Sequence, residues 1–279
     1  MDGGGGGAEE GLEESGVVRA CVVRAGGTNC DGETKVALEE AGAEVELVHF
    51  RRMLEEGLRG YDVLVIPGGF SFGDRVRAGA IMGKELAGRM LPVLREFVEG
   101  GGAILGICNG FQVLVEAGLL PGFKWGEVQA ALALNNSAKF ECRWTYLRVE
   151  NGGKCLFTRG MRKGEVVRMP VAHAEGKFLF PAGREKEYLR KLREKDQLVF
   201  RYCDRRGRPA GGRYPVNPNG SFFDIAGICD STGRIMGLMP HPERAVFGWQ
   251  LPDWTGGDSP PEWGDGRKIF SSIVENLRR

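Results

Sequence analysis

The residue best placed to do chemistry in this sequence is a cysteine flanked by glycines. In the segment AILGICNGFQ, Cys108 follows a short apolar run and precedes a stretch with helical spacing, and Gly106 and Gly110 lie two residues to either side. This pattern is typical of a tight strand-to-helix turn that exposes a nucleophile, where larger neighbours would clash. A helix N-terminus also favours the nucleophilic thiolate. A cysteine elsewhere is most often a buried structural residue, but this setting favours covalent chemistry at Cys108.

A nucleophilic thiol needs a proton partner, and the chain contains three histidines. His49 falls inside a stretch expected to be a strand, and we expect it to be structural. His241 lies in GLMPHPERAV, directly after an apolar run, and the proline that follows it favours an extended chain in which His241 and Glu243 project the same way. His-Pro-Glu alone could be a surface loop. Together with Cys108 it predicts a nucleophile–base–acid triad.

Acyl transfer at such a triad also requires N–H groups that stabilise an oxyanion. The segment VIPGGFSFGD (65–74) ends an apolar run with two consecutive glycines, whose N–H groups could serve, although a plain strand-end turn would explain them equally well. By analogy with other nucleophile turns, the N–H of Asn109, directly after Cys108, is the second predicted donor.

Alternating strand and helix patterns must position these residues. Apolar runs suited to strands and segments with helical spacing alternate along the first half of the chain, at 17–24, 32–42, 44–50, 62–67, from Ala78, from Pro92, 103–107 and 109–118. This alternation predicts βαβ units and a mainly parallel sheet. Periodicity is weak over 121–183. Beyond it we expect helices at 183–196 and 267–279 and strands at 197–203, 222–229 and 234–239, the last two paired antiparallel across a turn.

The expected fold is therefore α/β, with three layers: a mainly parallel, doubly wound sheet, flanking helices and an antiparallel extension. Residues 1–16 are a Gly- and Glu-rich segment without an apolar face, and we expect them to be disordered. No linker divides 17–279, which we expect to form one domain.

Composition excludes several classes of protein. Of the 279 residues, 42% are hydrophobic and 27% charged, and the net charge is +1, so nothing indicates binding to nucleic acid or to an anionic membrane. No apolar run is long enough for a membrane helix, and the first residues do not resemble a secretory signal. Seven cysteines without a CxxC pair indicate neither a disulfide framework nor a metal site, so we expect no metal and a reducing, cytoplasmic setting.

GICNGFQ, PGGFSFGD and MPHPER together resemble the class I (triad) glutamine amidotransferases, which have a flavodoxin-like fold. Further segments resemble the glutaminase subunit of phosphoribosylformylglycinamidine synthase, an enzyme of purine biosynthesis, over about residues 17–279. These segments are RAGGTNCDGET, FSFGDRVRAGAI, LALNNSAKFECRW, VAHAEGKF, YPVNPNGS and IAGICDSTGRIMGLMPHPER.

This resemblance implies roles for individual residues. Cys108 would be the nucleophile, His241 the acid and base, and Glu243 its orienting partner, while Gly69 and Asn109 would supply the oxyanion N–H groups. The remaining residues that the resemblance brings to the site are Gln112, which would help to hold glutamine; Asn136, Ser137 and Phe140, which would line the same pocket or contact the synthase; and His173 and Glu175, which would lie beside the site without a catalytic role.

The resemblance also implies a partner. The substrate would be L-glutamine, and the ammonia released would pass to a large synthase subunit that converts formylglycinamide ribonucleotide to formylglycinamidine ribonucleotide, with a small third subunit in the complex. The chain itself carries no phosphate-binding loop: GAIMGKE (79–85) has the wrong glycine spacing and no Ser or Thr after its lysine. We therefore expect no cofactor in this chain, and ATP and magnesium on the partner.

Three alternatives stay open on the sequence. The chain could serve another synthase, such as those for anthranilate or guanylate, although NNSAKF and AHAEGKF fit the purine enzyme better. It could be a non-catalytic regulatory protein on the same fold, but such proteins generally lack a triad member, and none is missing here. It could also be a cysteine peptidase or another hydrolase with a similar turn.

Overall fold

The computed structural model describes residues 16–256 and 261–278. At its centre is a nine-stranded sheet with the strand order β2-β1-β3-β4-β11-β10-β9-β6-β7, accompanied by a two-stranded sheet of β5 and β8. The strands are β1 (Arg19–Arg24), β2 (Glu44–His49), β3 (Val63–Ile66), β4 (Ala103–Ile107), β5 (Ala131–Ala133), β6 (Glu141–Val149), β7 (Val166–His173), β8 (Lys177–Leu179), β9 (Leu198–Cys203), β10 (Ile225–Cys229) and β11 (Ile235–Leu238). The segment 1–16, expected to be disordered, lies outside the described residues except for Gly16.

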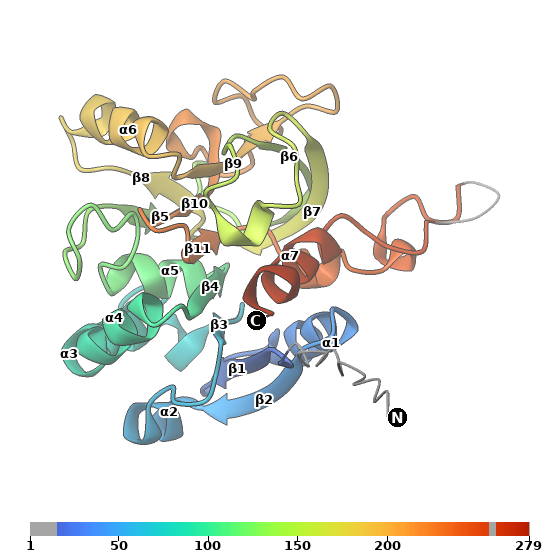
Figure 1. Ribbon diagram of the computed structural model, residues 1–279. Helices are drawn as coiled ribbons and strands as arrows, with labels where there is room; N and C mark the ends of the chain where they lie inside the picture. The colour runs from blue at the N-terminus through green and yellow to red at the C-terminus, as the bar shows by residue number, and fades with distance from the viewer. Residues whose placement is uncertain (1–15, 257–260, 279) are drawn as a thin grey trace, which may run out of the picture.

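Five strands form the parallel half of the sheet. Strands β2, β1, β3, β4 and β11 are neighbours and run parallel. Every residue of β3 and β4 is buried, because helices cover both faces, and this is why both strands are uninterrupted apolar runs. In Figure 1, α1 and α7 lie together on one side of these strands, and α3, α4 and α5 lie on the other. The predicted α/β fold is confirmed.

The helices follow the predicted periodicity closely, with one addition. They are α1 (Asp31–Glu40), α2 (Phe50–Glu56), α3 (Ala80–Arg89), α4 (Leu91–Glu99), α5 (Asn109–Glu116), α6 (Glu185–Glu194) and α7 (Arg267–Leu277). Helix α2 was not expected. The strand predicted over 44–50 ends at His49, whose Nδ1 accepts a hydrogen bond from the backbone N–H of Arg51 at 3.3 Å and caps α2.

The other four strands form the antiparallel extension. Strands β10 and β11 pair antiparallel across the predicted turn, with Gly227 opposite Leu238, and β9, β6 and β7 continue the sheet. Strands β6 and β7 fall in the region where the sequence showed weak periodicity. Strand β7 contains Pro170, which cannot donate to a neighbouring strand and is tolerated because β7 forms one edge of the sheet.

Strand order determines which loops meet. Strands β3, β4 and β11 are adjacent and parallel, so the residues after them, Gly68, Cys108 and His241, emerge at one edge of the sheet. The backbone N–H of Cys108 donates to the carbonyl of Leu238 at 2.8 Å, and that of His241 donates to the carbonyl of Pro170 at 2.8 Å. The two segments that carry the predicted nucleophile and base are thus held side by side.

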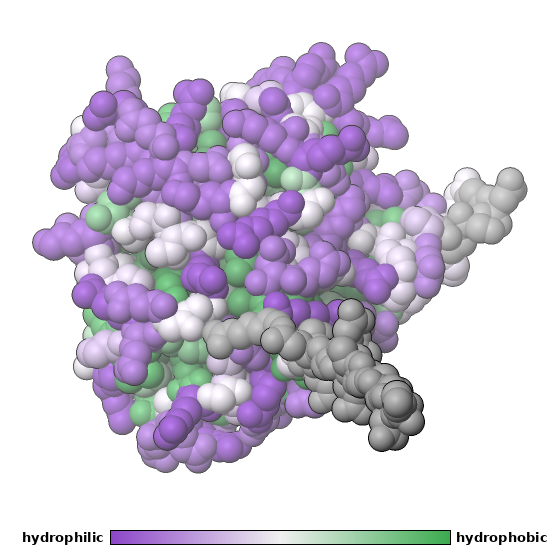
Figure 2. Space-filling model, in the orientation of Figure 1, coloured by the Kyte–Doolittle hydropathy of each residue, from purple (hydrophilic) through white to green (hydrophobic). Residues whose placement is uncertain are grey.

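The surface fits the composition. The face drawn in Figure 2 is mostly hydrophilic, with apolar residues showing between polar ones. In the part of the chain that the structure describes, no helix combines the length and apolarity needed to cross a bilayer.

Candidate active site

Cys108 lies in a strained turn between β4 and α5. Its φ is 51° and its ψ −103°, a conformation that side chains rarely adopt and that is found where function requires it. The glycines permit the turn: a Cβ on Gly110 would lie 1.9 Å from the carbonyl oxygen of Ile66, and one on Gly106 would lie 2.6 Å from that of Gly110. The strand and helix can therefore approach only with hydrogen at both positions.

A buried histidine–carboxylate pair accompanies the thiol. His241 Nδ1 lies 2.5 Å from an oxygen of Glu243, and the two side chains are 2% and 0% exposed. Glu243 is held in the 3-10 turn Pro242–Arg244, directly after the histidine. The other ring nitrogen of His241, Nε2, is buried and has no hydrogen-bond partner among residues 16–256 and 261–278. It is therefore available to exchange a proton.

Electrostatics favour the charged form of this imidazole. Burial alone would lower the pKa of His241, but the Glu243 carboxylate and the Cys108 and Cys30 sulfurs outweigh it, so that the pKa is raised well above its usual value. After Glu243, the strongest influence that favours the charged ring is the charge of Cys108. The structure therefore brings together the three side chains that the sequence proposes as a triad.

Two unpaired backbone donors lie near the thiol. Gly69 forms part of the cavity wall beside Cys108, and its φ of 147° and close approach to the backbone of residues 27–29 exclude a side chain. Within the described ranges, the N–H groups of Gly69 and Asn109 donate to no protein acceptor. Both are thus free to bind an oxygen atom at the site.

The cavity at Cys108 is small, with a volume of about 40 Å³. One water molecule occupies roughly 30 Å³ in the liquid, so the cavity is narrow compared with an amino acid. The lining residues are Gly69, Phe70, Asp74, Ala78, Cys108, Gln112, Ala172, His173, Ala174 and Glu175. The predicted site residues Gln112, His173 and Glu175 are therefore at the cavity.

An amide network joins the walls of this cavity. Gln112 Nε2 donates to the backbone carbonyl of Glu175 at 2.7 Å, and Gln112 Oε1 accepts from Asn109 Nδ2 at 3.0 Å. Asn109 Oδ1 in turn accepts from the backbone N–H of Ser71 at 3.1 Å. The side chains of Gln112 and Asn109 thus tie α5 to the loops after β3 and β7, besides any role toward substrate.

Asp74 is a cavity residue that the sequence did not predict. Its φ is 50°, and Asn109 Nδ2 donates to it at 3.2 Å. Burial, together with the nearby Glu175 carboxylate, raises the pKa of Asp74 to about 6. An acidic residue beside a glycine-rich turn is common in sequences, so only the structure identifies Asp74 as a residue of the site.

His173 is buried in a polar shell. Its Nδ1 lies 3.2 Å from Asn135 Oδ1, and its Nε2 lies 3.5 Å from Asn219 Nδ2. Burial, and to a smaller extent the charge of His241, lowers the pKa of His173 to about 3. His173 is therefore neutral at physiological pH and holds the loop that carries Glu175.

The three predicted glutamine contacts in 132–144 do not line the cavity. The Ser137 hydroxyl donates to Glu141 at 2.7 Å, and the backbone N–H of Asn136 donates to the carbonyl of Asn219 at 3.0 Å. Phe140 is 50% exposed, and its ring centroid lies 6.4 Å from that of Phe70, a cavity residue. The substrate roles of Asn136, Ser137 and Phe140 stay predictions.

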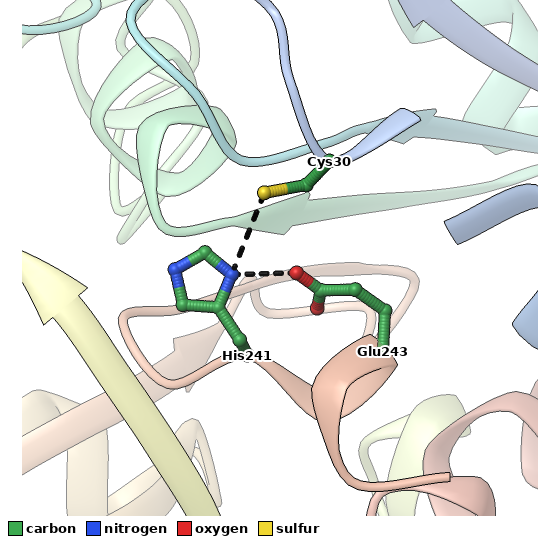
Figure 3. Close-up of side chains that lie close together, drawn as sticks. All are labelled: Cys30, His241 and Glu243. Atoms are coloured by element: carbon green, nitrogen blue, oxygen red, sulfur yellow. Dashed lines mark hydrogen bonds and ion pairs between the residues drawn. The ribbon is translucent and has the colours of Figure 1, made fainter. Parts of the chain in front are cut away.

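A second thiol beside the imidazole was not foreseen. Figure 3 shows Cys30 and Glu243 approaching the same ring nitrogen of His241. Cys30 Sγ lies 4.0 Å from His241 Nδ1 and 3.0 Å from Nη2 of Arg244. The separation of 211 positions between Cys30 and His241 leaves no spacing signal in the sequence.

Comparison with known proteins identifies the family of this chain. Residues 17–276 match the model of the CobB/CobQ-like glutamine amidotransferase domain. Phosphoribosylformylglycinamidine synthase subunit PurQ of Archaeoglobus fulgidus is 48% identical over 94% of this chain and 98% of its own length, and the subunit of the same name from Methanococcus maripaludis is 41% identical over the same shares.

Solved structures support the same conclusion. A chain of "PurLQS from Thermotoga maritima" aligns with a TM-score of 0.70 and 36% identity, over 94% of this chain and all of that one. A protein from Thermoplasma acidophilum described as part of a GMP synthase, with a TM-score of 0.52 and 18% identity over 94% of both chains, shares the fold. The chain belongs to the CobB/CobQ-like glutamine amidotransferase family and, within it, to the family of the phosphoribosylformylglycinamidine synthase subunit PurQ.

Proposed function

We propose that this chain is the glutaminase subunit of phosphoribosylformylglycinamidine synthase, which hydrolyses L-glutamine to glutamate and supplies the ammonia for a step of purine biosynthesis. Family membership supports the reaction class. The observation that carries the proposal is that Cys108, in its strained turn, and the buried His241, 2.5 Å from Glu243, emerge at the same edge of the sheet.

In the proposed reaction, the Cys108 thiolate attacks the side-chain amide carbon of glutamine and forms a tetrahedral intermediate. The N–H groups of Gly69 and Asn109 stabilise its oxyanion, a contribution of roughly 3–4 kcal/mol per donor in comparable sites. His241 gives its proton to the leaving nitrogen, and ammonia departs. A water molecule that loses a proton to His241 then hydrolyses the glutamyl thioester at Cys108 and releases glutamate.

Positioning roles follow from the same arrangement. Glu243 fixes the tautomer and orientation of His241, as the third group of a triad does. Gln112 helps to hold the glutamine, Asn136, Ser137 and Phe140 contact it or the partner, and His173 and Glu175 support the cavity wall without reacting.

We place the acceptor chemistry on partner subunits. The similar chain from Thermotoga maritima belongs to a structure titled PurLQS, and we propose that this chain likewise works with a large synthase subunit, which binds ATP and magnesium, and a small third subunit. The complex would convert formylglycinamide ribonucleotide to formylglycinamidine ribonucleotide in the cytoplasm. A cavity of about 40 Å³ fits this proposal, because docking of the partner would open it to glutamine and couple hydrolysis to synthesis.

Glutamate release, measured for the purified chain with and without the large and small subunits, tests the proposal. We expect slow hydrolysis by the isolated chain, strong activation by the partners, and loss of activity to the level of the background in Cys108→Ala. Equal rates for Cys108→Ala and the native chain would refute the reaction, and full turnover without partners would refute the coupling.

A further inference from the structure

The cluster of Cys30, His241 and Glu243 has the donor set of a metal site. One ligand atom from each residue, the thiol sulfur, a ring nitrogen and a carboxylate oxygen, lies within 4.8 Å of the other two, and all three residues are buried. Sulfur, imidazole and carboxylate together are ligands that thiophilic divalent cations such as Zn²⁺ prefer. Three protein ligands leave a fourth position for water.

The distances come close to those that a tetrahedral ion requires. With Zn²⁺ bonds of about 2.0–2.3 Å, ligand atoms are roughly 3.4–3.6 Å apart. Here the sulfur lies 4.0 Å and the carboxylate oxygen 2.5 Å from His241 Nδ1. Shifts of about 1 Å or less in these two distances, with the sulfur and the oxygen, which lie within 4.8 Å of each other, also drawn together, would admit the ion. One oxygen of Glu243, Oε2, is buried without a hydrogen-bond partner among the described residues, so it is available as a ligand, while the ion replaces the hydrogen bond between Oε1 and His241 Nδ1.

Cys30 is set apart from the other buried thiols by its surroundings. It lies at the N-terminus of α1, where Nη2 of Arg244 donates to its sulfur at 3.0 Å and the sulfur lies 3.2 Å from Asn29 Oδ1, so polar groups already face it. Arg244 is 35% exposed and has room to swing toward solvent when a cation enters.

From this geometry we propose that a thiophilic divalent cation binds Cys30 Sγ, His241 Nδ1 and a carboxylate oxygen of Glu243, and thereby inhibits the enzyme reversibly. Cys30 binds as the thiolate, and its proton leaves to solvent. His241 Nδ1 also loses its proton to solvent and binds through the lone pair, so the neutral ring keeps its proton on Nε2. An imidazole fixed in that form has no lone pair to accept a proton from Cys108 or from water, so glutamine hydrolysis stops.

Direct metal binding is tested on the full chain with Cys108→Ala, which removes the other thiol that acts on His241. Titration with Cd²⁺, followed by thiolate-to-metal charge-transfer absorption, should show one site. That site should disappear in Cys30→Ser/Cys108→Ala, whereas Cys142→Ser/Cys108→Ala, which removes an exposed thiol, should retain it. In Cd²⁺-soaked crystals of Cys108→Ala, anomalous scattering should place the ion between Cys30 Sγ and His241 Nδ1, a result that requires no variant of Cys30 to fold.

Inhibition is tested on the assembled enzyme. Cys30→Ser should raise the Zn²⁺ concentration that halves glutamate release at least tenfold, and Cys142→Ser should leave it unchanged. Absence of the Cd²⁺ site in Cys108→Ala, an ion located elsewhere, or equal Zn²⁺ sensitivity of Cys30→Ser and the native chain would each overturn the proposal. The inhibition part rests on the proposed glutaminase function, but the Cd²⁺ measurements do not need turnover, so the two proposals can fail separately.

Discussion

The chemistry of the site depends on how one imidazole is held. His241 is enclosed, and its charged form is favoured by Glu243 at one nitrogen and by sulfur atoms nearby. Without those partners, burial would make the ring neutral, because desolvation lowers the pKa of a histidine. The carboxylate therefore has two effects: it orients the ring, and it keeps a proton available for the leaving ammonia.

Glu243→Gln removes the charge of this side chain while keeping its shape. We expect kcat/KM for glutamine to fall by about 100-fold or more, as when the third member of a triad loses its charge. The pKa of His241 should fall with the loss of its strongest charged partner, so the alkaline limb of the pH–rate profile should move to lower pH. The measurement is glutamate release by the complex over a range of pH.

The matched control is Glu187→Gln, which removes a half-buried carboxylate on α6 that pairs with Arg184 and Lys191. Its pH profile should match that of the native chain. An unchanged alkaline limb in Glu243→Gln would show that Glu243 does not set the protonation of His241.

At the scale of elements, the site is a property of the β4–α5 turn and of strand order. Gly110 allows α5 to begin against the end of β3, and the pairing of β4 with β11 brings the segment after Leu238 next to Cys108. None of these contacts involves the reacting atoms. They nevertheless determine where the nucleophile and base can meet.

Gly110→Ala should destabilise the protein by more than about 3 kcal/mol, because a methyl group 1.9 Å from the Ile66 carbonyl oxygen forces strand and helix apart in a closely packed region. Glutaminase activity should fall with it. Urea unfolding measures the change in the free energy of unfolding.

Gly88→Ala is the control, since Gly88 lies in α3 and nothing is within 4 Å of its added Cβ. Alanine is the better helix former by about 0.5–1 kcal/mol, so this variant should be as stable as the native chain or slightly more so. Equal stability of the two variants would contradict the role given to the turn.

How far the sequence predicts these elements follows from their environment. Strand β4 begins and ends where predicted, at 103–107, because a strand covered on both faces must be apolar throughout. Strands β6 and β7 escaped prediction because they lie at and beside a sheet edge, where charged residues and Pro170 are tolerated and blur the pattern. The sequence did not predict Cys30 and Asp74 at the site, because the folded chain brings them there and no sequence spacing indicates it.

At the scale of the whole molecule, the two buried histidines link stability to pH in opposite directions. The pKa of His173 is lowered to about 3 in the folded protein. At this residue the unfolded chain therefore binds a proton more readily than the folded protein does. As a result, stability is lost as pH falls from about 6.5 toward 3. The pKa of His241 is raised, so its contribution is full below about 6.5 and is lost as pH rises through the raised value.

His173→Gln should therefore flatten the fall in stability between pH 6 and pH 4, even if it lowers stability at neutral pH by removing contacts with Asn135. Urea unfolding at several pH values gives the slope. His49→Gln, at an exposed position, should keep the slope of the native chain. An unchanged slope in His173→Gln would mean that other groups cause the acid sensitivity.

The proposed hydrolysis requires a covalent glutamyl intermediate on Cys108. Acid quenching of the assembled enzyme during turnover, followed by mass spectrometry of its peptides, should find a glutamyl adduct on the peptide that carries Cys108 and none on that of Cys30. The adduct and glutamate release should both vanish in Cys108→Ala. An adduct on another residue, or turnover by Cys108→Ala at the native rate, would contradict the account.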